Sequence, residues 1–139
     1  MPEALPRNLL SIPWKGPVMR QITEHVGNPV NDQLTITAID GPGSGGASHL
    51  YQIAGPAGAM MGRLTINFQH GPIGEVGVNG ITNEALLAIV IDRLCAFQAG
   101  PFRCVENQIA LMHAKGALAA LHDRTRERVQ RGVEGFTKE

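Results

Sequence analysis

Four side chains in the last third of the chain have types and spacing that suit the binding of a small ligand. Phe97 and Asn107 flank a break between two predicted helices at Gly100-Pro101. Arg124 and Arg128 follow one long helix later, four residues apart, and so share a helical face. A ring can stack on a base, an amide can hydrogen-bond to it, and paired guanidinium groups can clamp phosphate. Together these groups indicate nucleotide binding without bond breaking.

Each of these residues also has an ordinary structural interpretation. Phe97 could be a core residue, and Asn107 could simply begin a helix. The arginine cluster could be a solvated helix end, where positive charge suits the helix dipole. Arginine outnumbers lysine nine to three, and four of the twelve cations fall between Arg124 and Arg131. Arginine suits forked contacts to phosphate, but the composition alone leaves both interpretations open.

The first of the two helices is predicted over Asn83–Gln98. Thr82 is a suitable N-cap, and Gly100-Pro101 follows the helix as an exit signal. Its apolar residues recur at helical spacing and predict a buried stripe; they are Leu87, Val90 or Ile91, Leu94 and Phe97.

The second helix is expected to begin at Phe102 or Val105 and to end at Arg131. Its predicted apolar stripe consists of Ile109, Met112, Leu118 and Leu121. It would be roughly 40 Å long against about 24 Å for the first helix, so its distal part overhangs. An overhang that exposed Leu118 and Leu121 would be unfavourable in a monomer, so we expect oligomers.

The same helix separates the candidate residues by more than a small ligand spans. From Asn107 to Arg124 is about 25 Å along one helix. If Phe97 and Asn107 share a site with the two arginines, the arginines must come from a second, antiparallel hairpin. A two-fold dimer would then hold two equivalent sites between its subunits.

The rest of the chain predicts an α+β fold in a single domain over residues 1–139. Five prolines predict an irregular arm over residues 1–32, with one helical turn near Arg20–His25 and Trp14 as its anchor. Alternating apolar residues and glycine-rich connectors predict a small antiparallel β-sheet over residues 33–70. A long C-terminal antiparallel helical hairpin follows over residues 82–132.

The predicted sheet strands are 33–39, 49–53 and 63–69. Gly41–Gly46 follows the first of them and matches the glycine spacing of a dinucleotide-binding loop. A strand rather than a helix comes next, so we reject that interpretation.

No catalytic motif is recognisable among the polar residues: Asp40, Ser48 and His49 form none, and neither do Glu75 and His70. His113 and His122 do not share a metal-binding face, and the two cysteines form no zinc motif. We therefore expect no enzyme activity, metal or cofactor.

The composition also limits the partners. Twelve acidic residues balance twelve cations, which argues against affinity for nucleic acid polymers or membranes. Met1–Pro6 has no apolar core segment and no apolar run is long enough for a membrane span, so we expect a cytoplasmic protein with free thiols.

Several motifs resemble the type one phage Thoeris anti-defence family, which is related through its hairpin to phage anti-CBASS sponges. The resemblance covers about residues 33–135, and the segments that carry it are Gly77–Leu87, Asp92-Arg93-Leu94, Phe97–Asn107 and Arg124–Gly135. It implies a non-enzymatic sponge that sequesters cyclic ADP-ribose signals, such as glycocyclic ADP-ribose, made by bacterial TIR proteins. It further implies a phage-encoded protein acting in the host cytoplasm.

The resemblance also assigns roles to residues. Phe97 would stack on adenine, Asn107 would hydrogen-bond the ligand, and Arg124 and Arg128 would clamp the pyrophosphate. A loop containing Ala47 and His49 is a candidate for closing the pocket. Arg63, the one cation of the sheet region, is a candidate for a second site that binds cyclic di- or trinucleotides in a hexamer built as a trimer of dimers.

One alternative of a different class remains at this stage. The arginine-rich helix end could contact phosphate backbones in a small phage structural or nucleic-acid-binding protein. That alternative predicts affinity that falls steeply with salt and little preference for small ligands.

Overall fold

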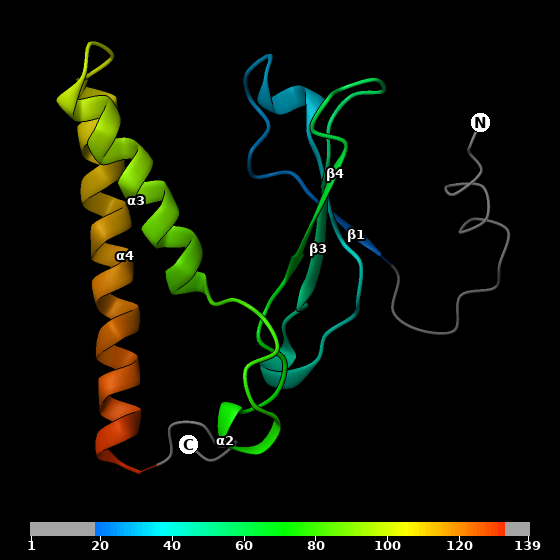
Figure 1. Ribbon diagram of the computed structural model, residues 1–139, viewed down its shortest axis with the longest axis vertical. Helices are drawn as coiled ribbons and strands as arrows, with labels where there is room; N and C mark the ends of the chain where they lie inside the picture. Colours follow the sequence, from blue (N-terminus) through cyan, green and yellow to red (C-terminus); the bar gives the residue numbers. More distant parts are fainter. Residues whose placement is uncertain (1–18, 133–139) are drawn as a thin grey trace, which may run out of the picture. The chain divides into compact units, whose positions relative to one another are not determined.

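The computed structural model describes residues 19–132, which form parts of two units that meet between Asn67 and Phe68. The first unit contains a β-sheet and the second contains the helices, which confirms the α+β fold (Figure 1). Trp14 lies outside the described residues, and so does the predicted motif beyond Gly132.

The sheet has four antiparallel strands in the order β1-β2-β3-β4. Their bounds are Arg20–Ile22 for β1, Thr35–Ala38 for β2, Leu50–Ala54 for β3 and Arg63–Asn67 for β4. Sequential neighbours pair throughout, so the sheet is an antiparallel meander. Two short 3-10 turns lie between strands, at Asn31–Gln33 and Ser44–Gly46.

The register of the sheet separates an apolar face from a polar one. Ile22, Ile36, Ile53 and Leu64 form one row across all four strands. The adjacent row of Gln21, Thr37, Gln52 and Thr65 points to the opposite face, because successive side chains alternate. Ala38 is the most deeply buried apolar residue among those described, at 1% exposure.

Strand β1 corrects the prediction for the N-terminal arm. Arg20–Ile22 was expected to belong to a helical turn, but it is extended and pairs with Ile36–Ala38. The backbone groups of this short segment form hydrogen bonds with a neighbouring strand, and no local sequence pattern predicts that pairing. Beyond the strand, the His25 ring hydrogen-bonds the Leu34 carbonyl at 2.7 Å.

The loop after β2 is fastened by Asp40. Its carboxylate accepts hydrogen bonds from the N–H groups of His49 and Leu50 at 3.0–3.1 Å. The buried Ser48 hydroxyl donates to the Asp40 carbonyl at 3.0 Å and accepts from Arg20 at 3.3 Å. Burial raises the pKa of Asp40, but the backbone hydrogen bonds outweigh burial and hold this pKa below its ordinary value. The glycine-rich loop is therefore a structural turn.

The second unit begins with a loop fastened by two amides. The Gln69 side chain donates to the carbonyls of Gly71 and Gly77, and it accepts from the Asn79 N–H at 2.9 Å. Asn79 in turn makes two hydrogen bonds with the backbone of His70. These contacts enclose a short helix, α2, over Ile73–Val76.

The end of this loop leads directly into the helical hairpin. A β-carbon on Gly80 would lie 2.4 Å from the Phe68 carbonyl carbon, so only glycine fits there. The next residues start helix α3 (Asn83–Ala99), and Thr82 caps it as predicted by accepting the Ala85 N–H at 3.1 Å.

Helix α3 packs against helix α4 (Val105–Gln130), and α4 extends past the start of α3 (Figure 1). The buried or half-buried residues recur at helical spacing on each helix. Those that face the helix–helix contact include Leu87, Ile91, Leu94 and Gln98 on α3, and Leu111, Ala114, Leu118 and Leu121 on α4. Among the described residues, no helix is long and apolar enough to cross a membrane.

The buried stripes differ from the predicted ones. Ile109 and Met112 were assigned to the stripe of α4 but are 49% and 62% exposed. Phe97 of α3 is likewise exposed, whereas Ile91, predicted as the alternative to Val90, is half-buried. Both helices carry more apolar residues than one interface uses, so spacing alone did not select the buried set.

Candidate ligand-binding residues at the two ends of the hairpin

The turn between α3 and α4 positions Phe97 and Asn107. The Gly100 N–H donates to the Phe97 carbonyl at 3.2 Å and closes the end of α3. Gln98 then accepts a hydrogen bond from the Cys104 N–H at 3.0 Å. The Cys104 sulfur caps α4 by accepting the Asn107 N–H at 3.4 Å. The Phe97 ring and the Asn107 amide therefore lie on either side of a turn that these hydrogen bonds stabilise.

Phe97 is 37% exposed, and two described side chains contact its ring. The Phe102 ring lies with its centroid 6.5 Å away and tilted by 59°. The Arg93 guanidinium lies over the Phe97 ring, with Cζ 5.5 Å from the ring centroid. Cations within about 6 Å of an aromatic face are attracted to it. Phe97 thus lies outside the buried stripe and keeps an accessible aromatic surface.

Asn107 is half-buried in the first turn of α4. Its backbone N–H is used by Cys104. Within the described part of the chain, its side-chain amide makes no hydrogen bond, although an amide offers two donors and an acceptor. Asn107 could therefore hydrogen-bond a ligand beside the turn.

The arginines at the far end of α4 are not equivalent. Arg126 pairs with Asp123, and Arg131 pairs with Glu127 at 3.0 Å, so both charges are partly compensated. Arg124 is exposed and makes no ion pair with a described residue. Arg128 is only 7% exposed. Arg124 is therefore the most available of these four cations for an anionic ligand.

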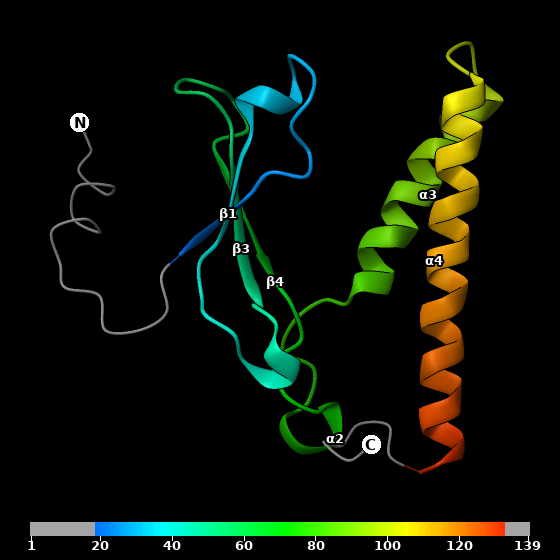
Figure 2. The ribbon, with the colours of Figure 1, turned by 180° about the vertical axis from the view of Figure 1, so that it is seen from behind.

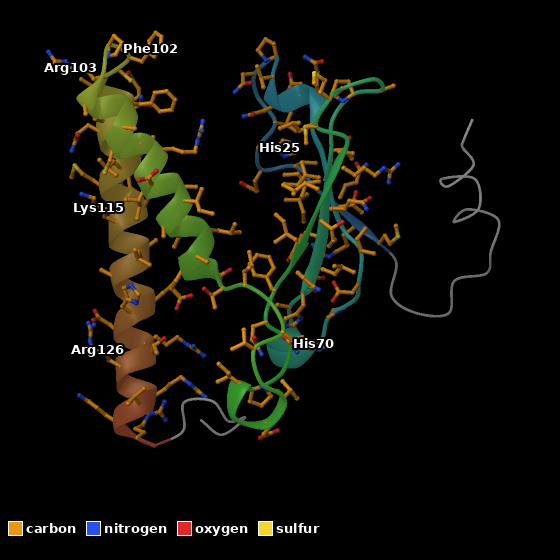
Figure 3. The ribbon with its side chains drawn as sticks, viewed as in Figure 1. His25, His70, Phe102, Arg103, Lys115 and Arg126 are labelled. Atoms are coloured by element: carbon orange, nitrogen blue, oxygen red, sulfur yellow. The ribbon has the colours of Figure 1, made fainter. Side chains whose placement is uncertain are left out.

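The two groups of candidate residues lie at opposite ends of the hairpin. Figure 2 shows the α3–α4 turn at one end and the last turns of α4, in red, at the other. In Figure 3, Phe102 and Arg103 mark the turn, Lys115 lies midway and Arg126 lies towards the far end. Helix α4 is continuous over this length, so about 25 Å separates Asn107 from Arg124. Within one chain these residues do not meet.

The remaining candidates belong to the first unit. Ala47 is exposed in the loop fastened by Asp40, and the N–H of His49 is one of the donors to Asp40. Arg63 is exposed on β4 and donates to the Gln52 side chain at 2.9 Å. Among the described residues, no group of three or more His, Cys, Asp or Glu side chains could hold a metal ion.

Two comparisons with known proteins identify relatives of this chain. The family described as the Acb2/Tad1 hairpin domain matches residues 61–126. A phage protein, Thoeris anti-defense 1 of Bacillus phage SBSphiJ7, is 47% identical over 93 residues, which is 67% of this chain. The chain belongs to the Acb2/Tad1 hairpin family. The aligned region spans 63% of the length of the phage relative.

The match to the Acb2/Tad1 hairpin domain includes most of the candidate residues. It extends from Met61, two residues before β4, to Arg126 and so contains Arg63, Phe97, Asn107 and Arg124. Arg128 lies two residues beyond it. The family confirms the resemblance noted from the sequence, whereas the roles of the individual residues are not tested by it.

Neither Arg93 nor Gln98 was assigned a role from the sequence, although both lie in segments that were singled out there. Arg93 precedes Phe97 by four residues, a spacing at which side chains on a helix meet. That signal was present in the sequence. The contact of Gln98 with Cys104 crosses the turn, and it could not be read from the sequence before the turn geometry was known.

Proposed function

We propose that this protein is a non-enzymatic sponge that binds and sequesters cyclic ADP-ribose-type signals, such as glycocyclic ADP-ribose, and so blocks bacterial Thoeris defence on behalf of a phage. Membership of the Acb2/Tad1 hairpin family and the name of its phage relative support an anti-defence role. The observation that carries the binding proposal is the accessible Phe97 ring, placed outside the buried stripe of its own hairpin.

The proposed site forms between two subunits. Phe97 would stack on the adenine and Asn107 would hydrogen-bond the ligand. Arg124 of the partner subunit would meet the pyrophosphate, because the arginine end of the same chain is about 25 Å away. Antiparallel packing of two hairpins brings the turn of one beside the arginine end of the other, and two-fold symmetry creates two such sites.

Exposed apolar residues on α4 support self-association. Val105, Ile109 and Met112 are 49–69% exposed and are spaced at four and three residues, which places them on one face. Gly116 continues this face and has open space around it, so another helix could approach closely. Leaving such a stripe in water is unfavourable, and a second copy of the chain offers the same stripe in return.

The clamp at the arginine end has two parts in this proposal. The exposed Arg124 makes the first contact with the ligand phosphates, and its fork suits them. Arg128 is buried in the single chain, so its part in the clamp requires that assembly or ligand binding makes its guanidinium reachable.

The proposal extends to a second ligand class. Arg63 would bind cyclic di- or trinucleotides in a hexamer built as a trimer of dimers, and the loop with Ala47 and His49 would close the first pocket. The exposure of Arg63 on β4 supports its proposed role in binding cyclic oligonucleotides. Binding at this second site would extend the activity to CBASS defence.

Calorimetric titration tests both parts of the proposal. The purified chain is titrated with cyclic ADP-ribose isomers and, separately, with cyclic di- and trinucleotides. Sequestration needs only tight binding, because the free signal falls as sites fill. Heating the saturated complex should release unmodified ligand; recovery of a cleaved product would overturn the sponge proposal in favour of an enzyme.

The alternative of phosphate-backbone binding draws on the arginine-rich end of α4. Ion pairing of Arg126 and Arg131 weakens it, because acidic neighbours oppose contact with a polyanion. The two functions differ in their salt dependence. Binding of a nucleic acid polymer should fall by orders of magnitude over a few-fold rise in salt, whereas a small dianionic ligand held partly by stacking should be affected much less.

A further inference from the structure

The Phe97 ring is already occupied by a cation from its own helix. Arg93 and Phe97 are four residues apart on α3, and both side chains are exposed. The guanidinium carbon of Arg93 lies 5.5 Å from the ring centroid. Phe102, tilted by 59° at 6.5 Å, is the second neighbour of the ring. A base that stacks on Phe97 therefore arrives beside Arg93.

Among the described residues, Arg93 also has no acidic partner. Within residues 19–132 its one recorded contact is the Phe97 ring, and it makes no ion pair or hydrogen bond there. By contrast, Arg126 and Arg131 are paired with carboxylates. The guanidinium of Arg93 thus has all five N–H donors available to an anionic ligand.

From this geometry we infer that Arg93 is a further ligand-binding residue, which leaves the face of Phe97 when a base stacks there and contacts the phosphates of the same nucleotide. This inference rests on the proposed function, since it concerns the ligand that Phe97 would hold. It places one cation on the subunit that supplies the ring, facing the arginines of the partner subunit across the ligand.

The relative strength of the two interactions favours this exchange. An exposed cation–π contact changes an equilibrium constant by a factor of about 2 to 5. Forked hydrogen bonds from a guanidinium to phosphate are worth more, about 10- to 100-fold. Arg93 therefore loses little by leaving the ring. The local spacing keeps it within reach, because β-carbons four residues apart on a helix are about 5–6 Å apart.

Affinity measurements on three variants test the inference. Arg93→Ala should weaken binding of the best cyclic ADP-ribose isomer by about 10- to 100-fold. Arg93→Lys, which keeps the charge but not the fork, should lose less. Lys115→Ala is the matched control: it also removes one exposed positive charge from the hairpin, near its middle, and should bind like the wild type (Figure 3).

Salt separates a phosphate contact from a change in packing. The deficit of Arg93→Ala should shrink between about 0.05 M and about 0.5 M salt, because screening weakens the contact that the variant lacks. Helicity and oligomer mass are recorded for each variant, so that an unfolded protein is not mistaken for a weak binder. If Arg93→Ala unfolds, the same comparison is made with Arg93→Gln, which retains the long stem.

The possible outcomes are distinct. Wild-type affinity in a folded Arg93→Ala variant would overturn the role of Arg93 while leaving the sponge function intact. Tighter binding would also overturn it, because Arg93 would then only compete with the base for the ring. If the wild-type chain binds none of the cyclic ADP-ribose isomers, the proposed function and the role of Arg93 both fail.

Discussion

Gln98 and Cys104 are joined across the turn of the hairpin. Oε1 of Gln98 accepts the Cys104 N–H at 3.0 Å, and Nε2 of Gln98 donates to Oε1 of Gln108 at 3.4 Å. One carboxamide at the end of α3 therefore contacts both the cap and the first turns of α4. Because Phe97 adjoins Gln98 and Asn107 adjoins Gln108, this carboxamide fixes the ring and the amide relative to each other.

Replacement of Gln98 should loosen the fixed spacing between Phe97 and Asn107. Gln98→Ala removes the acceptor of the Cys104 N–H and is expected to cost about 1 kcal/mol of stability. It should also weaken ligand binding severalfold, because Phe97 and Asn107 lose their fixed spacing. Gln98→Glu keeps an acceptor for Cys104 and should restore most of the affinity. Thermal unfolding and calorimetry measure the two effects; equal weakening by Ala and Glu would argue against positioning through Cys104.

The difference between Arg126, which pairs with Asp123, and the exposed Arg124 gives a second prediction. Arg124→Ala should abolish measurable binding of cyclic ADP-ribose isomers, with a loss of about 100-fold or more, because it removes an exposed fork that pairs with no acidic side chain in residues 19–132. Arg126→Ala removes the same charge two residues away, but from a residue that pairs with Asp123, and should change affinity by less than about 3-fold. Mass photometry should show unchanged oligomers for both. Equal losses in the two variants would indicate a diffuse electrostatic effect.

The sequence predicted those elements whose signals are local. Thr82 was recognised as the cap of α3 from its type and position, and its hydroxyl accepts the Ala85 N–H as expected. The end of α3 at Gly100-Pro101 was likewise evident. In each case a residue and its immediate neighbours contain the whole interaction, so no tertiary information is needed.

Interactions between distant segments were not predictable in the same way. Strand β1 forms because Arg20–Ile22 pairs with Ile36–Ala38. Gln21 and its partner Thr37, for example, are sixteen residues apart in the sequence. The choice of Leu111 rather than Ile109 for the buried face of α4 depends on how α3 packs. The candidate residues were found by type and spacing, but only the structure showed that Arg124 is exposed whereas Arg128 is buried.

The carboxylate of Asp40 should make stability dependent on pH. Its pKa is lowered in the folded state, so it contributes stability that is fully present above its unfolded pKa, about 3.9. This stability is lost as the pH falls through the lower folded value. Asp40→Asn should remove this dependence and cost about 1 kcal/mol at neutral pH, because charge-assisted bonds to His49 and Leu50 are lost. Urea unfolding at neutral and acidic pH measures both effects. If Asp40→Asn loses as much stability at acidic pH as the wild type, Asp40 is not the source of the pH dependence.

Two glycines of the second unit should respond oppositely to alanine. Gly80→Ala places a β-carbon 2.4 Å from backbone atoms of Phe68, so the loop before α3 must shift. A loss of about 2 kcal/mol or more is expected from such backbone overlap. Gly116→Ala meets open space within the single chain and, where the protein is monomeric, should stabilise α4 by about 0.5–1 kcal/mol; the comparison is made under those conditions because Gly116 lies on the face proposed for self-association. Thermal unfolding compares the two, and similar midpoints would show that the Phe68–Gly80 contact is not rigid.

The exposed face of α4 should govern assembly and binding together. Ile109→Glu places a charge in the Val105–Ile109–Met112 stripe and should dissociate the oligomer, because a charge buried in an apolar interface without a partner is strongly unfavourable. Binding should be lost with assembly if the site needs two subunits. Met60→Glu is the matched control, since Met60 is fully exposed in the β3–β4 connection and lies outside the hairpin. Sedimentation velocity gives the mass and calorimetry gives the affinity. A monomeric Ile109→Glu protein with wild-type affinity would show that one chain suffices, and the arrangement across two subunits would have to be abandoned.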